Sequence, residues 1–70
     1  MSELQITSEF ITLAQAVKLA GLAGTGGQAK YLVRVGEVAV NGIACTQPGK
    51  KLMPGDRFSH GTEEWTIQAR

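Results

Sequence analysis

The sequence has few of the residues on which catalysis, metal binding and disulfide frameworks depend. Its 70 residues contain one cysteine and one histidine. A lone cysteine excludes an internal disulfide framework, and one cysteine with one histidine falls short of even a minimal zinc site. No Gly-Lys-Ser/Thr follows the glycine-rich segment at the spacing of a P-loop. We therefore expect no enzyme activity, no metal and no cofactor.

Long hydrophobic runs are also missing. No apolar stretch approaches the roughly 18 residues that a membrane-spanning helix needs. The first residues, Met1-Ser2-Glu3-Leu4-Gln5, lack the basic region and long apolar stretch of a secretory signal. Apolar residues still make up 43% of the chain, which is enough for one hydrophobic core. The composition predicts a single soluble, cytoplasmic domain over residues 1–70 with no membrane partner, and we expect it to be a monomer.

The net charge is small, and its distribution is more informative than its total. Seven basic and six acidic side chains give +1, which by itself is weak evidence for a nucleic-acid partner. The central part of the chain is nevertheless mostly basic, since Glu37 is the only acid there before Asp56. The other acids lie near the two ends. This pattern allows one basic face on a nearly neutral domain.

The first half of the chain predicts a strand and two short helices. Leu4 and Ile6 alternate with polar residues, as in a half-buried strand. Thr12, with Gln15 three residues later, has the pattern of a helix N-cap and capping box. An apolar stripe follows at helical spacing, and Gly21 and Gly24 are natural stops. The stripe consists of Leu13, Ala16, Val17 and Ala20, and Lys18 lies outside it, facing water.

A second helix is predicted from Gly26-Gly27 to Val35. Gly36 follows as the residue that ends it in a left-handed conformation. Lys30 and Arg34 are four residues apart and share one outer face. The side chains expected to face inward are Ala29, Leu32, Val33 and Val35.

The second half predicts strands joined by turns. Asn41-Gly42 between the alternating segments 37–40 and 43–45 is a strong signal for a hairpin with a type I′ turn. Residues 47–51 are predicted as a loop, Pro54-Gly55-Asp56 and residues 61–64 as turns, and 57–60 and 65–68 as strands. The predicted order is β-α-α-β-β-β-β. It gives an α+β fold with two short helices packed on a small antiparallel sheet that contains the hairpin.

The order of these motifs resembles the S4 RNA-binding domain. The resemblance rests on a short helix with Ala29-Lys30, then Gly36, Val38-Ala39-Val40-Asn41-Gly42 and a later Pro54-Gly55-Asp56, and it extends from about Ile11 to Phe58. Ile11-Thr12-Leu13 and Leu19-Ala20-Gly21-Leu22 are further similar to small stand-alone bacterial S4-like proteins of the YaaA and YbcJ type. The resemblance implies binding to structured RNA, ribosomal or tRNA-like.

One motif departs from the family pattern. Typical S4 domains have Ser-Arg-x-x-Ala at the start of the second helix, where this chain has Gly26-Gly27-Gln28-Ala29. The arginine that other members offer to RNA is therefore missing. The departure implies a lower affinity or a different RNA partner.

The start of the second helix is nevertheless suited to phosphate. Unpaired backbone N–H groups at the positive end of the helix dipole attract anions, and Gly26 and Gly27 have no side chains to block a close approach. Further positive charge would come from Lys30 and Arg34 on the helix. The loop residues Lys50 and Lys51 would add to it, and Lys18 is a further candidate. Such contacts position a protein on RNA without reading bases.

Each of these features also has a purely structural interpretation. Gly26-Gly27 would serve as a helix-to-helix turn, and the five basic side chains as solvated surface. Asn41-Gly42 is first a structural turn. Tyr31 is expected to pack partly on the helix surface, with base stacking as the alternative. His60 and Cys45 are expected to be structural, and Phe58 and Trp65 to lie in the core.

Two hypotheses of function follow. The first is a non-catalytic RNA-binding module that uses the basic helix face and the Lys50-Lys51 loop. The second is a protein-interaction domain that uses the same helix and hairpin. An apolar surface patch of several hundred Å² in place of a basic one would favour the second hypothesis.

Overall fold

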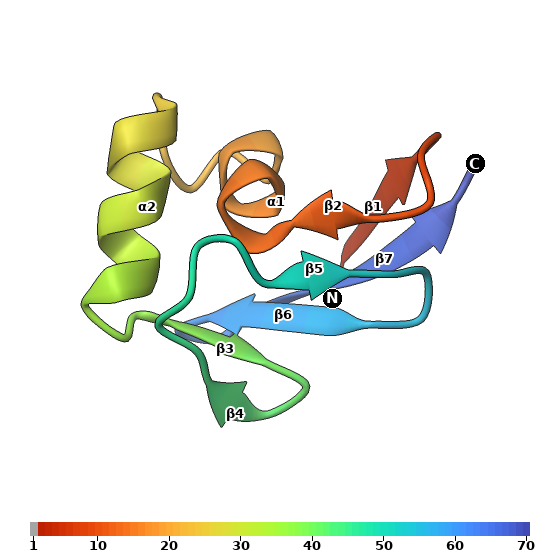
Figure 1. Cartoon of the computed structure of the whole chain (residues 1–70). Helices are drawn as coiled ribbons and strands as arrows, with labels where there is room; N and C mark the ends of the chain where they lie inside the picture. Colours follow the sequence, from red (N-terminus) through yellow and green to blue (C-terminus); the bar gives the residue numbers. More distant parts are fainter. Residues whose placement is uncertain (1) are drawn as a thin grey trace.

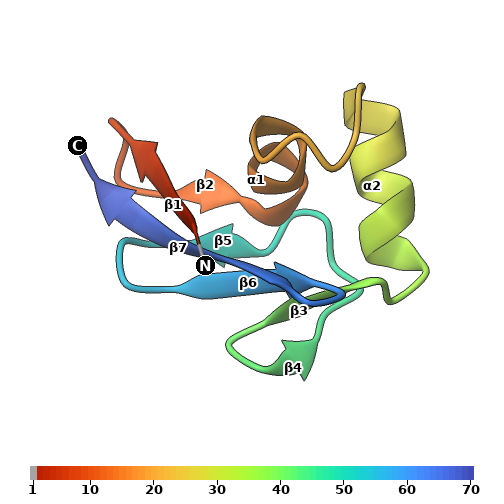
Figure 2. The same ribbon diagram turned by 180° about the vertical axis from the view of Figure 1, so that it is seen from behind.

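Two helices cover one face of a five-stranded sheet in the computed structural model, which describes residues 2–70 (Figure 1). A two-stranded ribbon of β2 and β5 lies beside the first helix, and the view from behind shows both helices on the same side of the sheet (Figure 2). The elements are β1 (Ser2–Ile6), β2 (Ile11–Thr12), α1 (Leu13–Leu19), α2 (Gly26–Arg34), β3 (Val38–Val40), β4 (Ile43–Ala44), β5 (Lys51–Leu52), β6 (Arg57–His60) and β7 (Glu63–Ala69). The predicted α+β class is confirmed.

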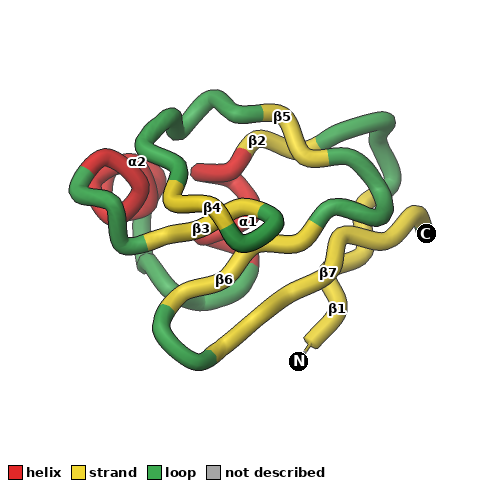
Figure 3. The backbone as a smooth tube through the Cα atoms, turned by 90° about the horizontal axis from the view of Figure 1, so that it is seen from below, coloured by secondary structure: helices red, strands yellow, loops and turns green. Residues whose placement is uncertain are grey.

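The five-stranded sheet is mixed, which corrects the prediction of an antiparallel sheet. Its strand order is β1-β7-β6-β3-β4. The β3–β4, β3–β6 and β6–β7 pairs are antiparallel, but β1 pairs with β7 in parallel, with Leu4 opposite Ile67. Figure 3 shows β1 and β7 side by side, with the β3–β4 hairpin further along the sheet. The pairing of the first and last strands is not visible in the sequence of either segment, because it depends on how the whole chain folds.

The hydrophobic core lies between the helices and the inner face of the sheet. Partners across antiparallel strands share a face, so Val40, Phe58 and Trp65 point inward together. The Phe58 and Trp65 rings stack with centroids 5.2 Å apart, and both side chains are buried, which confirms them as core residues. The buried core comprises Ile6, Ile11, Leu13, Ala14, Ala16, Val17, Ala29, Val33, Val38, Val40, Leu52, Phe58, Trp65 and Ile67.

Local capping chemistry fixes the ends of both helices. Thr12 caps α1, and its hydroxyl accepts from the Gln15 N–H while the Gln15 side chain accepts from the Thr12 N–H, so the predicted capping box is confirmed. Gly36 follows α2 with φ +81°, and its N–H donates to the Val33 carbonyl. This is the left-handed termination that the sequence predicted. Gly21 ends α1 in the same way, with φ +82°.

The predicted hairpin is confirmed, whereas several element boundaries differ from the prediction. Asn41 and Gly42 have φ values of +50° and +87°, as a type I′ turn requires. Strand β7 begins already at Glu63, so the turn before it is shorter than predicted. Val35 is the C-cap of α2 and is 51% exposed, so the expectation that it faces inward is wrong. Within the described residues, no helix is long and apolar enough to cross a membrane.

Candidate nucleic-acid interface

Three of the predicted site residues line one hollow between the two helices and the β4–β5 loop. Lys18 from α1, with Gly26 and Lys30 from α2, border a depression of 380 Å³. We call this depression the helix hollow; its lining is Thr12, Ala14, Gln15, Lys18, Gly26, Lys30, Pro48 and Gly49. The prediction named all three as candidates, but it did not place Lys18 beside Gly26 and Lys30 or foresee that the β4–β5 loop would form a wall of the hollow.

The N-terminus of α2, at the edge of the helix hollow, keeps free hydrogen-bond donors. Thr25 is the N-cap, and its hydroxyl accepts from the Gln28 N–H at 3.1 Å. The Gln28 side chain reaches back and accepts from the Gly24 N–H at 2.9 Å. Among residues 2–70, no group accepts from the N–H of Gly26 or Gly27. Both donors point out of the first helical turn, where the helix dipole adds positive potential.

The space in front of these donors is open. A Cβ atom added at Gly26 would meet nothing within 4 Å, and one at Gly27 would come only within 3.9 Å of the Thr25 hydroxyl. The protein packing therefore does not require glycine at either position. What glycine provides here is an unobstructed approach to the backbone N–H groups.

The cations of the helices lie on exposed surface. Lys30 and Arg34 are both exposed and one turn apart on α2, while Ala29 and Val33 on the same helix are buried, so the predicted outer face is confirmed. Lys18 is exposed in the last turn of α1, as predicted. Lys30 lines the helix hollow, whereas Arg34 lies beyond it toward the C-terminal end of α2.

Lys50 and Lys51 do not act as one loop, which corrects the prediction for residues 47–51. Lys51 begins strand β5 and pairs with Thr12, and its ammonium lies 4.8 Å from the centroid of the Phe10 ring. This contact is a cation–π interaction. Lys50 lies in the loop and borders a different hollow from the one that contains Lys18 and Lys30. Strand alternation separates the two neighbouring side chains.

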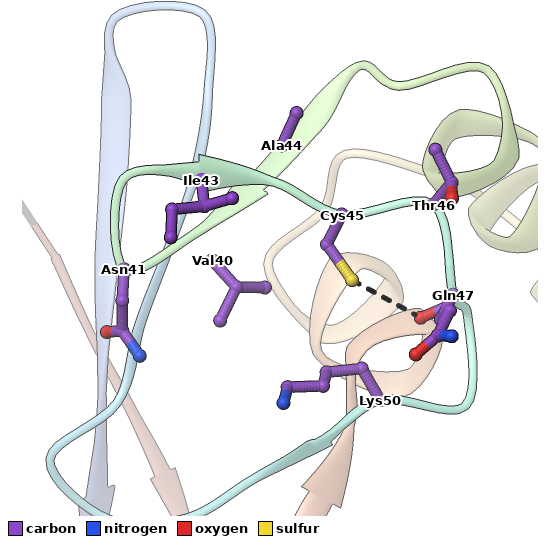
Figure 4. Close-up of a pocket in the computed structure, with 8 residues that line it drawn as sticks. All are labelled: Val40, Asn41, Ile43, Ala44, Cys45, Thr46, Gln47 and Lys50. Carbon is purple, nitrogen blue, oxygen red and sulfur yellow. Dashed lines mark hydrogen bonds between the residues drawn. The ribbon is translucent and has the colours of Figure 1, made fainter.

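The hollow beside Lys50 has a volume of 450 Å³ and lies between the β3–β4 hairpin and the β4–β5 loop (Figure 4). We call it the hairpin hollow. Pro48 and Gly49 of the same loop border the helix hollow, so the loop separates the two depressions. The lining of the hairpin hollow is Val40, Asn41, Ile43, Ala44, Cys45, Thr46, Gln47 and Lys50.

The hairpin is tied to the turn at Pro54-Gly55-Asp56. The Asn41 side chain accepts from the Arg57 N–H at 2.9 Å and donates to the Asp56 carboxylate at 3.3 Å. Asp56 also accepts from the Met53 N–H at 2.8 Å. These bonds join the Val-Asn-Gly and Pro-Gly-Asp motifs physically, so Asn41 has the structural role that was expected of it.

Sequence reasoning missed Thr25, Pro48 and Gly49. The signal for Thr25 was present, because Thr25 and Gln28 have the same spacing as the capping box of Thr12 and Gln15. No local pattern placed Pro48 and Gly49 against the helices. Their position follows from the hydrogen bonds that the Pro48 and Lys50 carbonyls accept from the N–H groups of Ala14 and Leu13.

The remaining chemical groups do not assemble into a cluster. Cys45 is half-buried, with its Sγ atom 3.8 Å from the Gln47 carbonyl, and His60 is half-buried in β6. Within residues 2–70, no three or more His, Cys, Asp or Glu side chains are grouped to hold a metal ion. The conspicuous chemistry of the described surface is therefore the open helix terminus with its neighbouring cations.

Comparison with known proteins agrees with the fold and its motifs. The family model described as "S4 domain" matches residues 4–68, which is nearly the whole chain. A Bacillus subtilis protein named "Probable ribosome maturation protein RlbA" is 42% identical over 53 residues, covering 76% of this chain and 75% of the relative. The two findings agree with the family that the motif order indicated: the chain belongs to the S4 domain family.

Proposed function

We propose that this protein is a non-catalytic module that binds structured ribosomal RNA through the N-terminus of α2 and the cations around the helix hollow. The observation that carries the proposal is the free Gly26 N–H in a hollow that Lys18 and Lys30 also line, with the free Gly27 N–H next to it in the same helical turn. Backbone donors, a helix dipole and two ammonium groups at one depression form a phosphate-binding surface. The S4 family match and the ribosome-related name of the Bacillus relative support RNA, and ribosomal RNA in particular, as the ligand.

The binding depends on shape and backbone more than on base sequence. Double-stranded RNA is recognised mostly through phosphates and 2′-hydroxyls, because its deep groove is closed to side chains. Arg34 extends the surface along α2, and Lys50 extends it across the β4–β5 loop. Lys51 is the weakest of the candidate contacts, since its ammonium already lies over the Phe10 ring.

A titration of labelled protein with a ribosomal RNA hairpin, followed by NMR at low and moderate salt, tests the proposal. Salt-sensitive shifts at the amides of Gly26, Gly27, Lys30 and Arg34 are expected, with smaller changes in β1 and β7. Absence of shifts at low salt would contradict the proposal and favour the protein-interaction alternative. That alternative would draw on exposed large apolar side chains from several parts of the chain, namely Phe10, Leu19, Tyr31, Val35, Ile43 and Met53.

A further inference from the structure

The hairpin hollow combines apolar side chains with amide, hydroxyl and ammonium groups. We propose that it receives one unpaired base of the same RNA, with Lys50 on the adjacent phosphate. This inference rests on the proposed RNA-binding function and adds to it a contact that distinguishes one RNA from another. Sequence-specific recognition of RNA targets bases that are free of a helix and can be splayed out.

The apolar part of the hollow offers a surface for the flat face of a base. Val40, Ala44 and Cys45 contribute to its lining, and Ile43 is 74% exposed beside them. Ile43 is the most exposed of the large apolar side chains in the described residues, so contact with an aromatic ring removes apolar area from water. The volume of 450 Å³ lies within the range of roughly 300–1,000 Å³ typical of ligand sites.

The polar part of the hollow fits the edge of a base and its phosphate. The amide of Gln47 and the hydroxyl of Thr46 have no hydrogen-bond partner among residues 2–70. An amide both donates and accepts, as the edge of a base does. Figure 4 shows the Lys50 side chain extending from the loop toward Val40, below Ile43 and Cys45. Asn41 also lines the hollow, but its amide already bonds Asp56 and Arg57, so Gln47 is the amide with more free hydrogen-bonding capacity for the edge of a base.

The walls of the hollow are held in place before any ligand arrives. The Cys45 N–H donates to the Val38 carbonyl, and the Lys50 N–H donates to the Gln47 carbonyl at 3.1 Å. The Lys50 carbonyl in turn accepts from the Leu13 N–H at 2.8 Å, which ties the loop to α1. A wall fixed in this way lowers the entropic cost of binding.

The two hollows lie on either side of the β4–β5 loop, so one RNA strand can contact both. Pro48 and Gly49 border the helix hollow, and their neighbours Gln47 and Lys50 border the hairpin hollow. An RNA strand that contacts the helix hollow and crosses this loop reaches the proposed base site on its other side. Continuity of this kind favours a base of the bound RNA over an unrelated small molecule.

The test compares a fully paired RNA hairpin with a set of hairpins that carry one unpaired 2-aminopurine at successive positions. Affinities are measured by fluorescence anisotropy, and the emission of the 2-aminopurine reports on the environment of the base. At one position or more, the wild-type protein is expected to bind the bulged RNA at least about fivefold more tightly, with a change in emission. Equal affinity at every position with unchanged emission would overturn the base site while leaving RNA binding intact.

Substitutions in and outside the hairpin hollow test where the unpaired base binds. Ile43→Thr keeps a β-branched side chain but removes apolar surface, and it is expected to bring the ratio of bulged to paired affinity toward one. Met53→Thr is the matched control, because Met53 is 58% exposed and does not line the hollow, so the ratio should persist. Gln47→Ala, in an exposed loop position, provides a second variant should Ile43→Thr unfold. If neither RNA binds the wild-type protein, the proposed function itself fails, and the base site fails with it.

Discussion

The two helices begin with the same residue types but end up with different N-termini. Each has a Thr N-cap whose hydroxyl accepts from the N–H of a Gln three residues later, Thr12 with Gln15 and Thr25 with Gln28. In α1 the remaining donors are also taken, since Leu13 donates to the Lys50 carbonyl and Ala14 to the Pro48 carbonyl. In α2 the equivalent donors belong to Gly26 and Gly27 and have no partner in the described residues.

The difference shows that tertiary structure decides whether the first N–H groups of a helix are left free to bind an anion. The β4–β5 loop supplies the carbonyls that accept from the first N–H groups of α1. These bonds hold the loop against α1, where it forms a wall of the helix hollow. The first turn of α2 faces that hollow without such a loop over it. Dipole and capping chemistry are similar in both helices, so the accessible donors and their neighbouring cations make the difference.

Reversal of charge on the exposed face of α2 should have the largest effect. Lys30→Glu combined with Arg34→Glu is expected to lower RNA affinity by more than about 100-fold, because it replaces attraction by repulsion of phosphate. Both side chains are exposed, so the circular dichroism spectrum should remain that of the folded protein. Fluorescence anisotropy with a ribosomal RNA hairpin measures the loss.

The matched control is Arg57→Glu with Arg70→Glu, which changes the net charge equally. Neither residue lines the helix hollow, so the control should bind RNA much better than the first double variant. Equal losses in the two proteins would mean that net charge alone governs binding. A folded Lys30/Arg34 variant with normal affinity would exclude the proposed surface.

Removal of one backbone donor should have the next largest effect. Gly26→Pro deletes an N–H at the first position of α2, where proline fits the helix, and the extended Thr25 with ψ +162° tolerates a following proline. RNA affinity is expected to fall by about tenfold, since a hydrogen bond to a charged group is lost. Stability in urea should be unchanged or higher by about 0.5 kcal/mol, because proline restricts the unfolded chain.

Gly26→Ala distinguishes the contribution of the N–H donor from that of the open space in front of it. Alanine keeps the N–H, and its Cβ would meet no atom within 4 Å. Its affinity should therefore lie between those of the wild type and the proline variant. If Gly26→Pro binds as tightly as the wild type, the open terminus is not used and the difference between the helices has no functional meaning.

Removal of each cap should affect stability by a smaller amount and sharpen the comparison. Thr12→Ala is expected to lower the free energy of unfolding by about 1 kcal/mol, and Thr25→Ala by about 0.5 kcal/mol. The smaller effect at Thr25 is expected because Thr25 is exposed whereas Thr12 is half-buried, so water replaces the lost hydroxyl more readily at Thr25. Urea denaturation measures both, and serine at either position should restore most of the loss. A larger loss of stability for Thr25→Ala than for Thr12→Ala would show that α2 depends on its N-cap more than α1 does.

The smallest expected change is in the dependence of binding on salt. With four or five cationic contacts, log affinity should fall against log salt with a slope of roughly −3 to −4.5. Lys30→Ala should reduce the steepness by about 1, and Lys51→Ala by less, since its ammonium lies over Phe10. Anisotropy titrations at several salt concentrations measure the slopes. Affinity that does not change over a tenfold range of salt would contradict the electrostatic account.

Prediction from sequence succeeded where a signal spans a few residues. The capping box at Thr12, the termination at Gly36 and the type I′ turn at Asn41-Gly42 are confirmed, and each depends on neighbouring residues. The short β2–β5 ribbon was missed, because Ile11 pairs with Leu52 only after the chain has folded. The same distance in sequence explains why the parallel pairing of β1 with β7 was not foreseen.

By itself, the sequence determined the family, the two helices with their caps and the hairpin. These features depend on hydrogen bonds and alternation within a few residues, so their patterns are visible in the chain. Only the tertiary structure decided which helix keeps free N–H donors. It also decided that Lys50 lines the hairpin hollow while the neighbouring Lys51 lies over the Phe10 ring. The physical reason is that a loop far along the chain supplies the carbonyls that accept from the first N–H groups of α1, while packing leaves Gly26 and Gly27 of α2 uncovered.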